Sequence, residues 1–123
     1  MLATINELEK KMKLEKITDA INLLRIVVGD IGIQQMLMLL TIMNEEGITQ
    51  VELSERFAFQ QGSVSKNCKR LSIEKYLKDG KEVVSGMNLI KLCPDPKRYR
   101  RLGCWLTPKG KLIKKELMLK LED

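Results

Sequence analysis

Apolar residues recur every three or four positions along the first 28 residues of the chain, which is the spacing of one face of an α-helix. Gly29 and Gly32 then interrupt the pattern, and glycine is a residue that favours the end of a helix. The same spacing resumes from Ile33 to Met43, with few polar residues between. We therefore expect a long N-terminal helix followed by a strongly apolar helix at the centre of the core.

Two shorter helices are predicted next, with a tight turn between them at residues 58–60. Thr49 and Glu52 have the spacing of a capping box, which indicates a helix over residues 50–57. Beyond the turn, a polar face alternates with an apolar stripe, and this pattern predicts a second helix over residues 61–75. A short helix, a turn and a second helix with an exposed polar face form the pattern of a helix-turn-helix.

A β-hairpin is predicted near the C-terminus. Residues 89–93 alternate between apolar and polar side chains after the first residue. A Pro-Asp-Pro sequence then bends the chain, and residues 102–106 return as a strand. The tip between the strands, within residues 95–101, carries Lys or Arg at four of its last five positions. A basic hairpin placed after a helix-turn-helix is typical of a winged helix.

The last helix has the clearest start signal in the chain. Thr107 is a favourable N-cap, and Pro108 occupies the first helical position, where proline costs no hydrogen bond. The helix is predicted to run from Lys109 to about Leu121.

The segment between the second motif helix and the wing, residues 77–88, is harder to interpret. It contains two turn signals, Asp79-Gly80 and Ser85-Gly86. We expect Glu82 to Ser85 to form an extra strand beside the wing.

These elements predict an α+β fold that is mainly α, a winged helix-turn-helix within one domain spanning residues 1–123. A chain of 123 residues is long enough for one such core and too short for two. Residues 33–107 hold the helix-turn-helix and the wing. Residues 1–31 and 108–123 form terminal helices that we expect to mediate dimerisation.

Composition excludes several classes of protein. No apolar run approaches the roughly 18 residues that span a bilayer, and the N-terminus has no secretory signal pattern, so we expect a cytoplasmic protein without a membrane partner. The chain has no histidine, and its three cysteines, Cys68, Cys93 and Cys104, include no CxxC pair. We therefore expect no zinc or other metal site, no cofactor and no catalytic residue. Cys68 is interpreted as a small core residue, and Cys93 and Cys104 as strand residues.

Positive charge is concentrated in one part of the chain. Residues 61–115 carry 15 Lys or Arg against 4 acids, a net +11, whereas residues 1–60 carry 6 against 9, a net −3. Residues 116–123 carry 1 against 3, a net −2. Charge segregated onto the second motif helix, the wing and the start of the last helix is the footprint expected of a surface that binds phosphates.

The candidate DNA-binding residues follow from this pattern. Side chains near the start of the second motif helix are of types that pair with base edges in a major groove, whereas cations farther along the helix and in the wing suit phosphates or the minor groove. The base-reading candidates are Gln60, Gln61, Ser63, Ser65 and Lys66; the remaining candidates are Lys69, Arg70, Lys97, Arg98, Tyr99, Arg100 and Arg101.

The sequence LSERFAFQQGSVSKNCKRL followed by PDPKRYRRLGCWLTPKG is similar to the winged helix of MarR-type transcriptional regulators. The resemblance covers about half of the chain, and Asp95, Arg100, Leu106, Thr107 and Gly110 keep the wing pattern of that family. It implies that the second motif helix enters the major groove, that Arg100 acts from the wing, and that the terminal helices interlock into a homodimer. We carry over no small-molecule effector, because the chain is shorter at both ends than typical members.

The sequence thus favours a homodimeric, sequence-specific binder of double-stranded DNA that acts as a transcriptional regulator, most simply as a repressor. Two alternatives use the same residues. One is a replication or partition protein of a plasmid or phage, and the other is a winged helix that binds an acidic protein partner.

Overall fold

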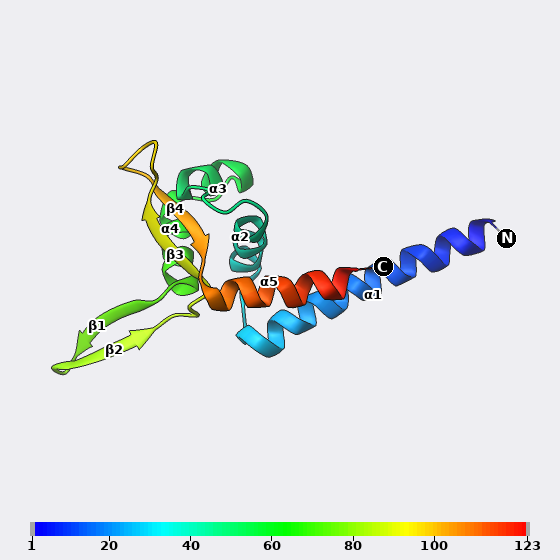
Figure 1. Ribbon diagram of the computed structural model, residues 1–123, viewed down its shortest axis with the longest axis horizontal. Helices are drawn as coiled ribbons and strands as arrows, with labels where there is room; N and C mark the ends of the chain where they lie inside the picture. Colours follow the sequence, from blue (N-terminus) through cyan, green and yellow to red (C-terminus); the bar gives the residue numbers. More distant parts are fainter. Residues whose placement is uncertain (1, 123) are drawn as a thin grey trace. The chain divides into compact units, whose positions relative to one another are not determined.

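The computed structural model describes residues 2–122 of the chain and contains five helices and four strands within that range (Figure 1). It divides into two compact units. One unit holds residues 32–112 and the other combines residues 1–31 with residues 113–123. The elements, in chain order, are α1 (Leu2–Val28), α2 (Ile33–Asn44), α3 (Gln50–Phe57), α4 (Gln61–Leu71), β1 (Glu74–Lys78), β2 (Lys81–Ser85), β3 (Ile90–Pro94), β4 (Leu102–Leu106) and α5 (Pro108–Leu121).

The core of the 32–112 unit is apolar and is centred on α2, as the sequence predicts. Met38, Leu39 and Ile42 on this helix have no exposed surface. Leu53 of α3 and Leu71 of α4 are equally buried. Three helices therefore bury one stripe each against a shared interior, which leaves their other faces available to solvent.

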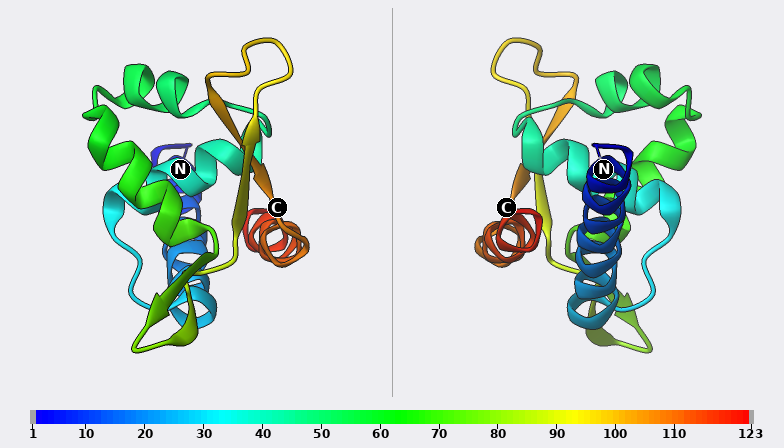
Figure 2. Two further views of the ribbon diagram at one scale, coloured as in Figure 1. Left: turned by 90° about the vertical axis from the view of Figure 1, so that its left-hand side faces the viewer. Right: turned by 90° about the vertical axis from the view of Figure 1, so that its right-hand side faces the viewer.

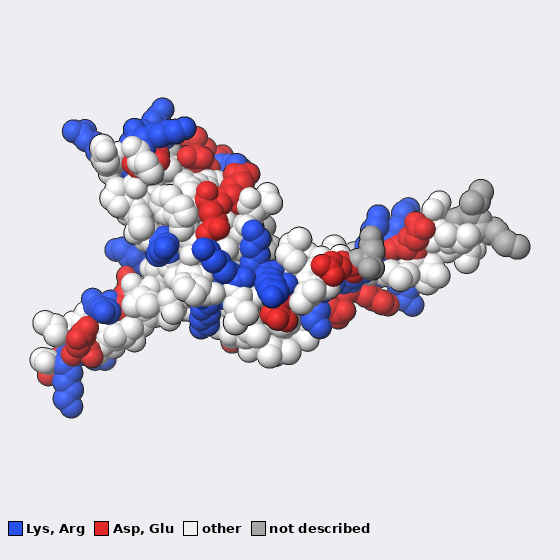
Figure 3. Space-filling model, viewed as in Figure 1, with Lys and Arg blue, Asp and Glu red and all other residues white. Residues whose placement is uncertain are grey.

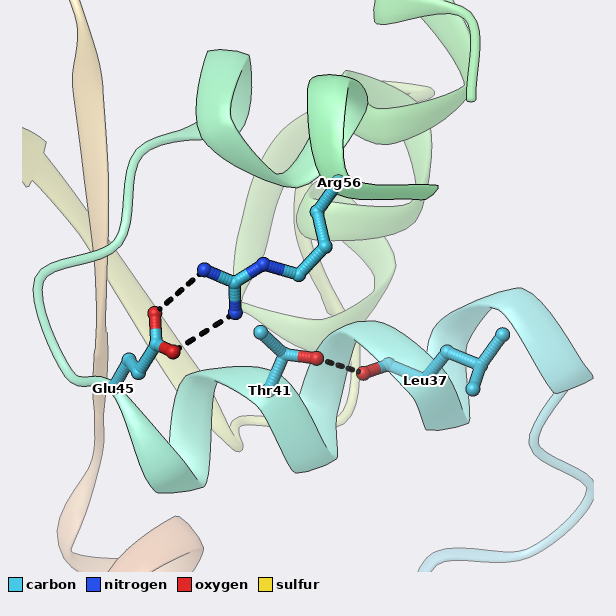
Figure 4. Close-up of polar contacts among 4 residues, drawn as sticks. All are labelled: Leu37, Thr41, Glu45 and Arg56. Carbon is cyan, nitrogen blue, oxygen red and sulfur yellow. Dashed lines mark hydrogen bonds and ion pairs between the residues drawn. The ribbon is translucent and has the colours of Figure 1, made fainter. Parts of the chain in front are cut away.

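Local interactions fix the start and position of α3. The Thr49 hydroxyl accepts a hydrogen bond from the Glu52 N–H at 3.1 Å and donates one to the Glu52 carboxylate at 3.0 Å. Figure 4 shows Arg56 of α3 donating two hydrogen bonds, of 2.9 and 3.0 Å, to the Glu45 carboxylate just after α2. These bonds hold the pKa of Glu45 below its usual value. The predicted α3, over residues 50–57, is confirmed.

The predicted second motif helix, over residues 61–75, is too long, because α4 ends at Leu71. The last carbonyls of the helix accept hydrogen bonds from the backbone of residues 87–89. Arg70 O accepts from Met87 N at 2.9 Å, and Leu71 O accepts from Leu89 N at 2.8 Å. Capture of these carbonyls by residues far along the sequence ends the helix and directs the chain into β1.

The strands form two separate antiparallel pairs, β1–β2 and β3–β4. The predicted wing strands are confirmed with a shift of one residue in the first, Ile90–Pro94 in place of 89–93. The strand predicted over Glu82–Ser85 is confirmed as β2. Its expected place beside the wing is wrong, because β2 pairs only with β1 and belongs to a different sheet. β1 and β2 are joined by a two-residue turn, in which Asp79 and Gly80 both have positive φ, as a type I′ turn requires.

Figures 1 and 2 show how the 32–112 unit is arranged. The wing tip and α3 lie at one end, and the β1–β2 hairpin lies at the opposite end. The helix α4 begins beside α3 and runs toward the β1–β2 hairpin. Because of this course, the first residues of α4 lie at the end of the unit that carries the wing tip.

The terminal unit consists of α1 and most of α5. Its buried apolar residues are Leu24 of α1 and Ile113 and Leu117 of α5. The last helix begins as predicted, because Thr107 Oγ1 accepts a hydrogen bond from Gly110 N at 3.1 Å and Pro108 occupies the first helical position.

A helix that crosses a bilayer must be both long and apolar. Among residues 2–122 no single helix meets both requirements. Thr4–Val28 and Ile33–Asn44 meet them only when counted together as a bent pair, which is weak evidence for a membrane span.

Candidate nucleic-acid interface

The helix α4 has one buried face and one exposed face, as the sequence predicts. Val64, Cys68 and Leu71 have no exposed surface. The opposite face presents polar and basic side chains. Gln61, Lys66, Lys69 and Arg70 are exposed, Ser63 and Ser65 are half-buried, and the exposed Gln60 is the N-cap residue.

The turn between α3 and α4 is held by hydrogen bonds that set where α4 begins. Ala58 adopts a left-handed conformation with φ 54°. The Phe59 N–H donates to Ser54 O at 3.1 Å, and the Ser54 hydroxyl donates to Phe59 O at 2.6 Å. The rings of Phe57 and Phe59 stack with centroids 5.3 Å apart. These contacts stabilise the turn and set the position of α4 relative to α3.

A hollow of about 300 Å³ lies at the junction of α3 and α4. It is lined by Gln50 and Val51 of α3 and by Gln61, Gly62 and Ser65 of α4. Gln61 and Ser65 are among the base-reading residues that the sequence predicts. Gln50, Val51 and Gly62 were missed, because only the packing of α3 beside α4 brings them to the same surface.

A second group of residues missed by the sequence holds α4 against α2. Gln35 is almost fully buried, and its Nε2 donates to Asn67 Oδ1 at 3.2 Å. Asn67 Nδ2 in turn donates to Gln34 Oε1 at 3.3 Å. Gln35 Oε1 also accepts from Gly32 N at 3.3 Å. This amide network links the middle of α4 to the first turn of α2 and thereby orients the exposed face of α4.

The wing is tied to the rest of its unit along the edge of β4. Gly47 N donates to Cys104 O and Cys104 N donates to Ile48 O, both at 2.8 Å. An isolated β-bridge joins Thr49 to Gly103, just before α3 begins. The Leu106 N–H donates to the Glu46 carboxylate at 2.8 Å. Since the same segment leads into α3, the wing and the helix-turn-helix are parts of one connected framework.

The wing tip folds into two successive turns. Arg98 N donates to Asp95 O at 3.1 Å, and Arg101 N donates to Arg98 O at 2.9 Å. The Asp95 carboxylate accepts from Lys97 N at 3.3 Å, so it acts on the backbone of the turn. The loop projects its side chains into solvent, and the Tyr99 side chain is 81% exposed.

The cations of the wing tip are not neutralised. Lys97, Arg98 and Arg100 are exposed and Arg101 is half-buried. Within residues 2–122 none of the four forms an ion pair with an acid. Figure 3 shows blue side chains gathered at the wing-tip end of the molecule. Four unpaired positive charges on one loop attract a polyanion.

The structure brings the wing tip and the predicted base-reading residues of α4 to one end of the 32–112 unit. The wing tip, α3 and the first turn of α4 all lie there (Figure 2). Lys69 and Arg70 lie farther along α4, two turns from its start. The assignment of base readers and phosphate holders along α4 stays a prediction.

The cysteines occupy the kinds of position that the sequence suggests. Cys68 of α4 and Cys104 of β4 are fully buried free thiols with their sulfur atoms 4.0 Å apart. The hydrogen bond between them lowers the pKa of Cys68 and raises the pKa of Cys104 far above its usual value, with burial adding to the increase for Cys104. Cys93 lies half-buried on β3. In the described part of the chain, no group of three or more His, Cys, Asp or Glu side chains has an arrangement that could hold a metal ion.

Comparison with known proteins identifies the fold. No protein-family model and no curated protein sequence matches the chain. Solved structures do match it. A MarR transcriptional regulator from Methanosarcina mazei Go1 is 21% identical over 86% of this chain and 71% of its own, with a TM-score of 0.56. The PcaV transcriptional regulator from Streptomyces coelicolor is 19% identical over 94% and 74%, with a TM-score of 0.55.

A third solved structure, a mutant form of MarR from E. coli, is 21% identical over 94% of this chain and 74% of its own, with a TM-score of 0.57. These matches show that the chain has the MarR-type winged-helix fold, mainly helical with small antiparallel sheets. The fold class that the sequence predicts is confirmed.

Proposed function

We propose that the chain is a sequence-specific binder of double-stranded DNA that acts in the cytoplasm as a homodimeric transcriptional regulator, most simply a repressor. The observation that supports this most strongly is the pairing of an uncompensated basic wing tip with the polar first turns of α4 at one end of one compact unit. The matched structures named as transcriptional regulators share this fold, which supports the same interpretation.

In the proposed complex the two elements have different tasks. The start of α4 enters the major groove, where Gln61 and Ser63 contact base edges. Lys69 and Arg70 hold phosphates, and Arg100 acts from the wing on the adjacent minor groove or backbone. Gln50 adds a backbone contact, because the first helix of such a motif crosses the sugar-phosphate chain beside the recognition helix.

The proposed dimer uses the terminal helices. Their exposed large apolar side chains are too numerous for a surface that stays in water, since soluble monomers rarely expose extended apolar patches. Each of these side chains is between 43% and 65% exposed: Ile5, Leu8, Met12, Leu14, Ile17, Ile21, Ile26 and Val27 of α1, and Leu112, Met118, Leu119 and Leu121 of α5.

The DNA proposal is tested by titrating the protein into a DNA duplex taken from the region next to its own gene. The duplex has about 30 base pairs, which is enough for two half-sites one helical turn apart. Binding is measured from low to physiological salt. We expect a linear log–log dependence with a slope of about −0.9 for each phosphate contacted. Weak binding with no salt dependence, on every duplex tried, contradicts the proposal.

Single substitutions separate the two tasks. Arg100→Ala should weaken binding to all sequences similarly, whereas Gln61→Ala and Ser63→Ala should change which base is preferred. If all three lower affinity equally for every sequence, the assignment of base readers is wrong.

The dimer is tested by light scattering at micromolar concentration. We expect twice the chain mass of 14.1 kDa, and Ile17→Glu should shift the population toward monomer because it places a charge in the apolar face. Lys11→Glu, at an exposed polar position of the same helix, is the control and should leave the mass unchanged.

A further inference from the structure

The β1–β2 hairpin has one face that nothing else in the described chain covers. Lys75 pairs with Val84 and Leu77 pairs with Glu82 across the two strands, so these four side chains share one face. Tyr76 and Val83, which pair with each other, lie on the other face of the hairpin. Leu77 is 76% exposed and Val84 is 59% exposed.

An isolated two-stranded hairpin is marginally stable in water. This one is left without support, because no backbone hydrogen bond reaches the outer edge of either strand among residues 75–84 in the described structure. Its exposed apolar residues favour a partner that covers them.

The charge of the hairpin argues for a protein partner and against DNA. Residues 74–85 carry three lysines and three acids, and their net charge is zero. By contrast, the wing tip has four unpaired cations. A neutral face with an apolar centre gains little binding free energy from contacts with phosphates. It gains more from burying its leucine and valine side chains.

The arrangement of the four side chains is self-complementary. Paired residues lie about 5 Å apart across the strands, and alternate residues lie about 7 Å apart along a strand, so the four positions form a rectangle. Lys75 and Glu82 occupy one diagonal, and Leu77 and Val84 occupy the other. Neither Lys75 nor Glu82 has an ion-pair partner within residues 2–122.

A two-fold axis along the Leu77–Val84 diagonal brings Lys75 of one copy close to the position of Glu82 in the other copy. Two copies related by this axis place Leu77 against Leu77 and Val84 against Val84. Each Lys75 then faces the Glu82 of the other copy, which gives two opposite-charge pairs around an apolar centre. Such a surface meets the requirement of an isologous contact, in which one patch matches itself.

We propose that the Lys75–Leu77–Glu82–Val84 face of the β1–β2 hairpin pairs with the same face of a second copy of the chain. The patch is much smaller than the roughly 800 Å² per partner of a stable interface. The contact is therefore weak, and it forms where copies are concentrated or held near one another. It is separate from the terminal-helix dimer and independent of DNA binding.

The first experiment uses cysteine cross-linking of the full chain in the Cys93→Ser background, which leaves only buried native thiols. Leu77→Cys should form a disulfide-linked pair of chains on mild oxidation of concentrated protein, because the residue lies on the proposed two-fold axis. Tyr76→Cys, on the opposite face and also exposed, is the matched control. We expect Leu77→Cys to link about tenfold faster, since a specific contact raises the local thiol concentration. Equal rates, or no linkage of either variant, overturn the proposal.

The second experiment tests the charge pairs. In the Leu77→Cys background, Lys75→Glu alone and Glu82→Lys alone should each slow cross-linking about fivefold, because like charges then face each other twice. Mixing the two variants should restore the rate for mixed pairs, in which both contacts again join opposite charges. Restoration on mixing cannot arise within one chain. Linkage that is unaffected by the substitutions, or not restored by mixing, contradicts the proposed contact.

Discussion

The two β-hairpins of this protein share their local design but differ in what surrounds them. Each pairs two five-residue antiparallel strands in continuous register. In β3–β4, Ile90, Cys104 and Leu106 are at most 1% exposed, and the chain before α3 bonds to the edge of β4. In β1–β2 no residue is fully buried and both edges are open in the described structure. Strand pairing alone therefore does not determine the role of a hairpin; its cover and its charge do.

The same truncation should have very different effects in the two hairpins. Leu106→Ala removes a core side chain and should lower the free energy of unfolding by about 2–5 kcal/mol. Leu77→Ala removes an exposed one and should change it by less than about 0.5 kcal/mol. Urea denaturation followed by circular dichroism measures both. Similar losses for the two variants would mean that the β1–β2 hairpin is covered in solution.

The root and the tip of the β1–β2 hairpin should also differ. A side chain on Gly86 would meet Ser72 O, and its φ is +103°. Gly86→Ala should therefore cost about 1–3 kcal/mol. Gly80 also has a positive φ, of +77°, but open space around it, so Gly80→Ala should cost about 1 kcal/mol from the backbone alone. Thermal unfolding of both variants measures the difference, and the reverse order would contradict the close contact at the root.

The two tips should contribute unequally to DNA binding. Arg100→Ala in the wing should reduce the salt dependence by about one phosphate contact and the affinity by about three- to tenfold. Lys78→Ala at the end of β1 should change neither, because its hairpin is neutral and lies at the other end of the unit. Fluorescence anisotropy with one duplex at several salt concentrations compares them. A loss with Lys78→Ala would assign the second hairpin to the DNA surface.

The sequence predicted the wing better than the other hairpin for a physical reason. The wing has strong local signals, namely alternation, the Pro-Asp-Pro bend and the Thr107-Pro108 helix start. The end of α4 has none, since it is set by hydrogen bonds from Met87 and Leu89 to carbonyls at the end of the helix. The helical pattern of the sequence therefore continues to residue 75, into residues that form β1 in the structure. The Asp79-Gly80 turn was the available local clue to a hairpin.

In the candidate interface, too, features with local sequence signals could be predicted and features set by packing between elements could not. Polarity and charge along α4 and the wing predicted which residues are exposed and which are buried. The hollow between Gln50 and Gln61 and the amide network of Gln35 and Asn67 depend on how helices pack. Spacing along the chain carries no information about such contacts between elements.

The Asp79–Gly80 turn has a practical consequence. It is exposed, joins the strands by the shortest common connection, and leaves the space around Gly80 empty. Loop tips of this kind tolerate inserted residues. A peptide tag or a fluorescent label placed between Asp79 and Gly80 would therefore be carried at the end of the unit opposite the wing. The protein thus has a natural attachment point for following its movements without altering either terminus.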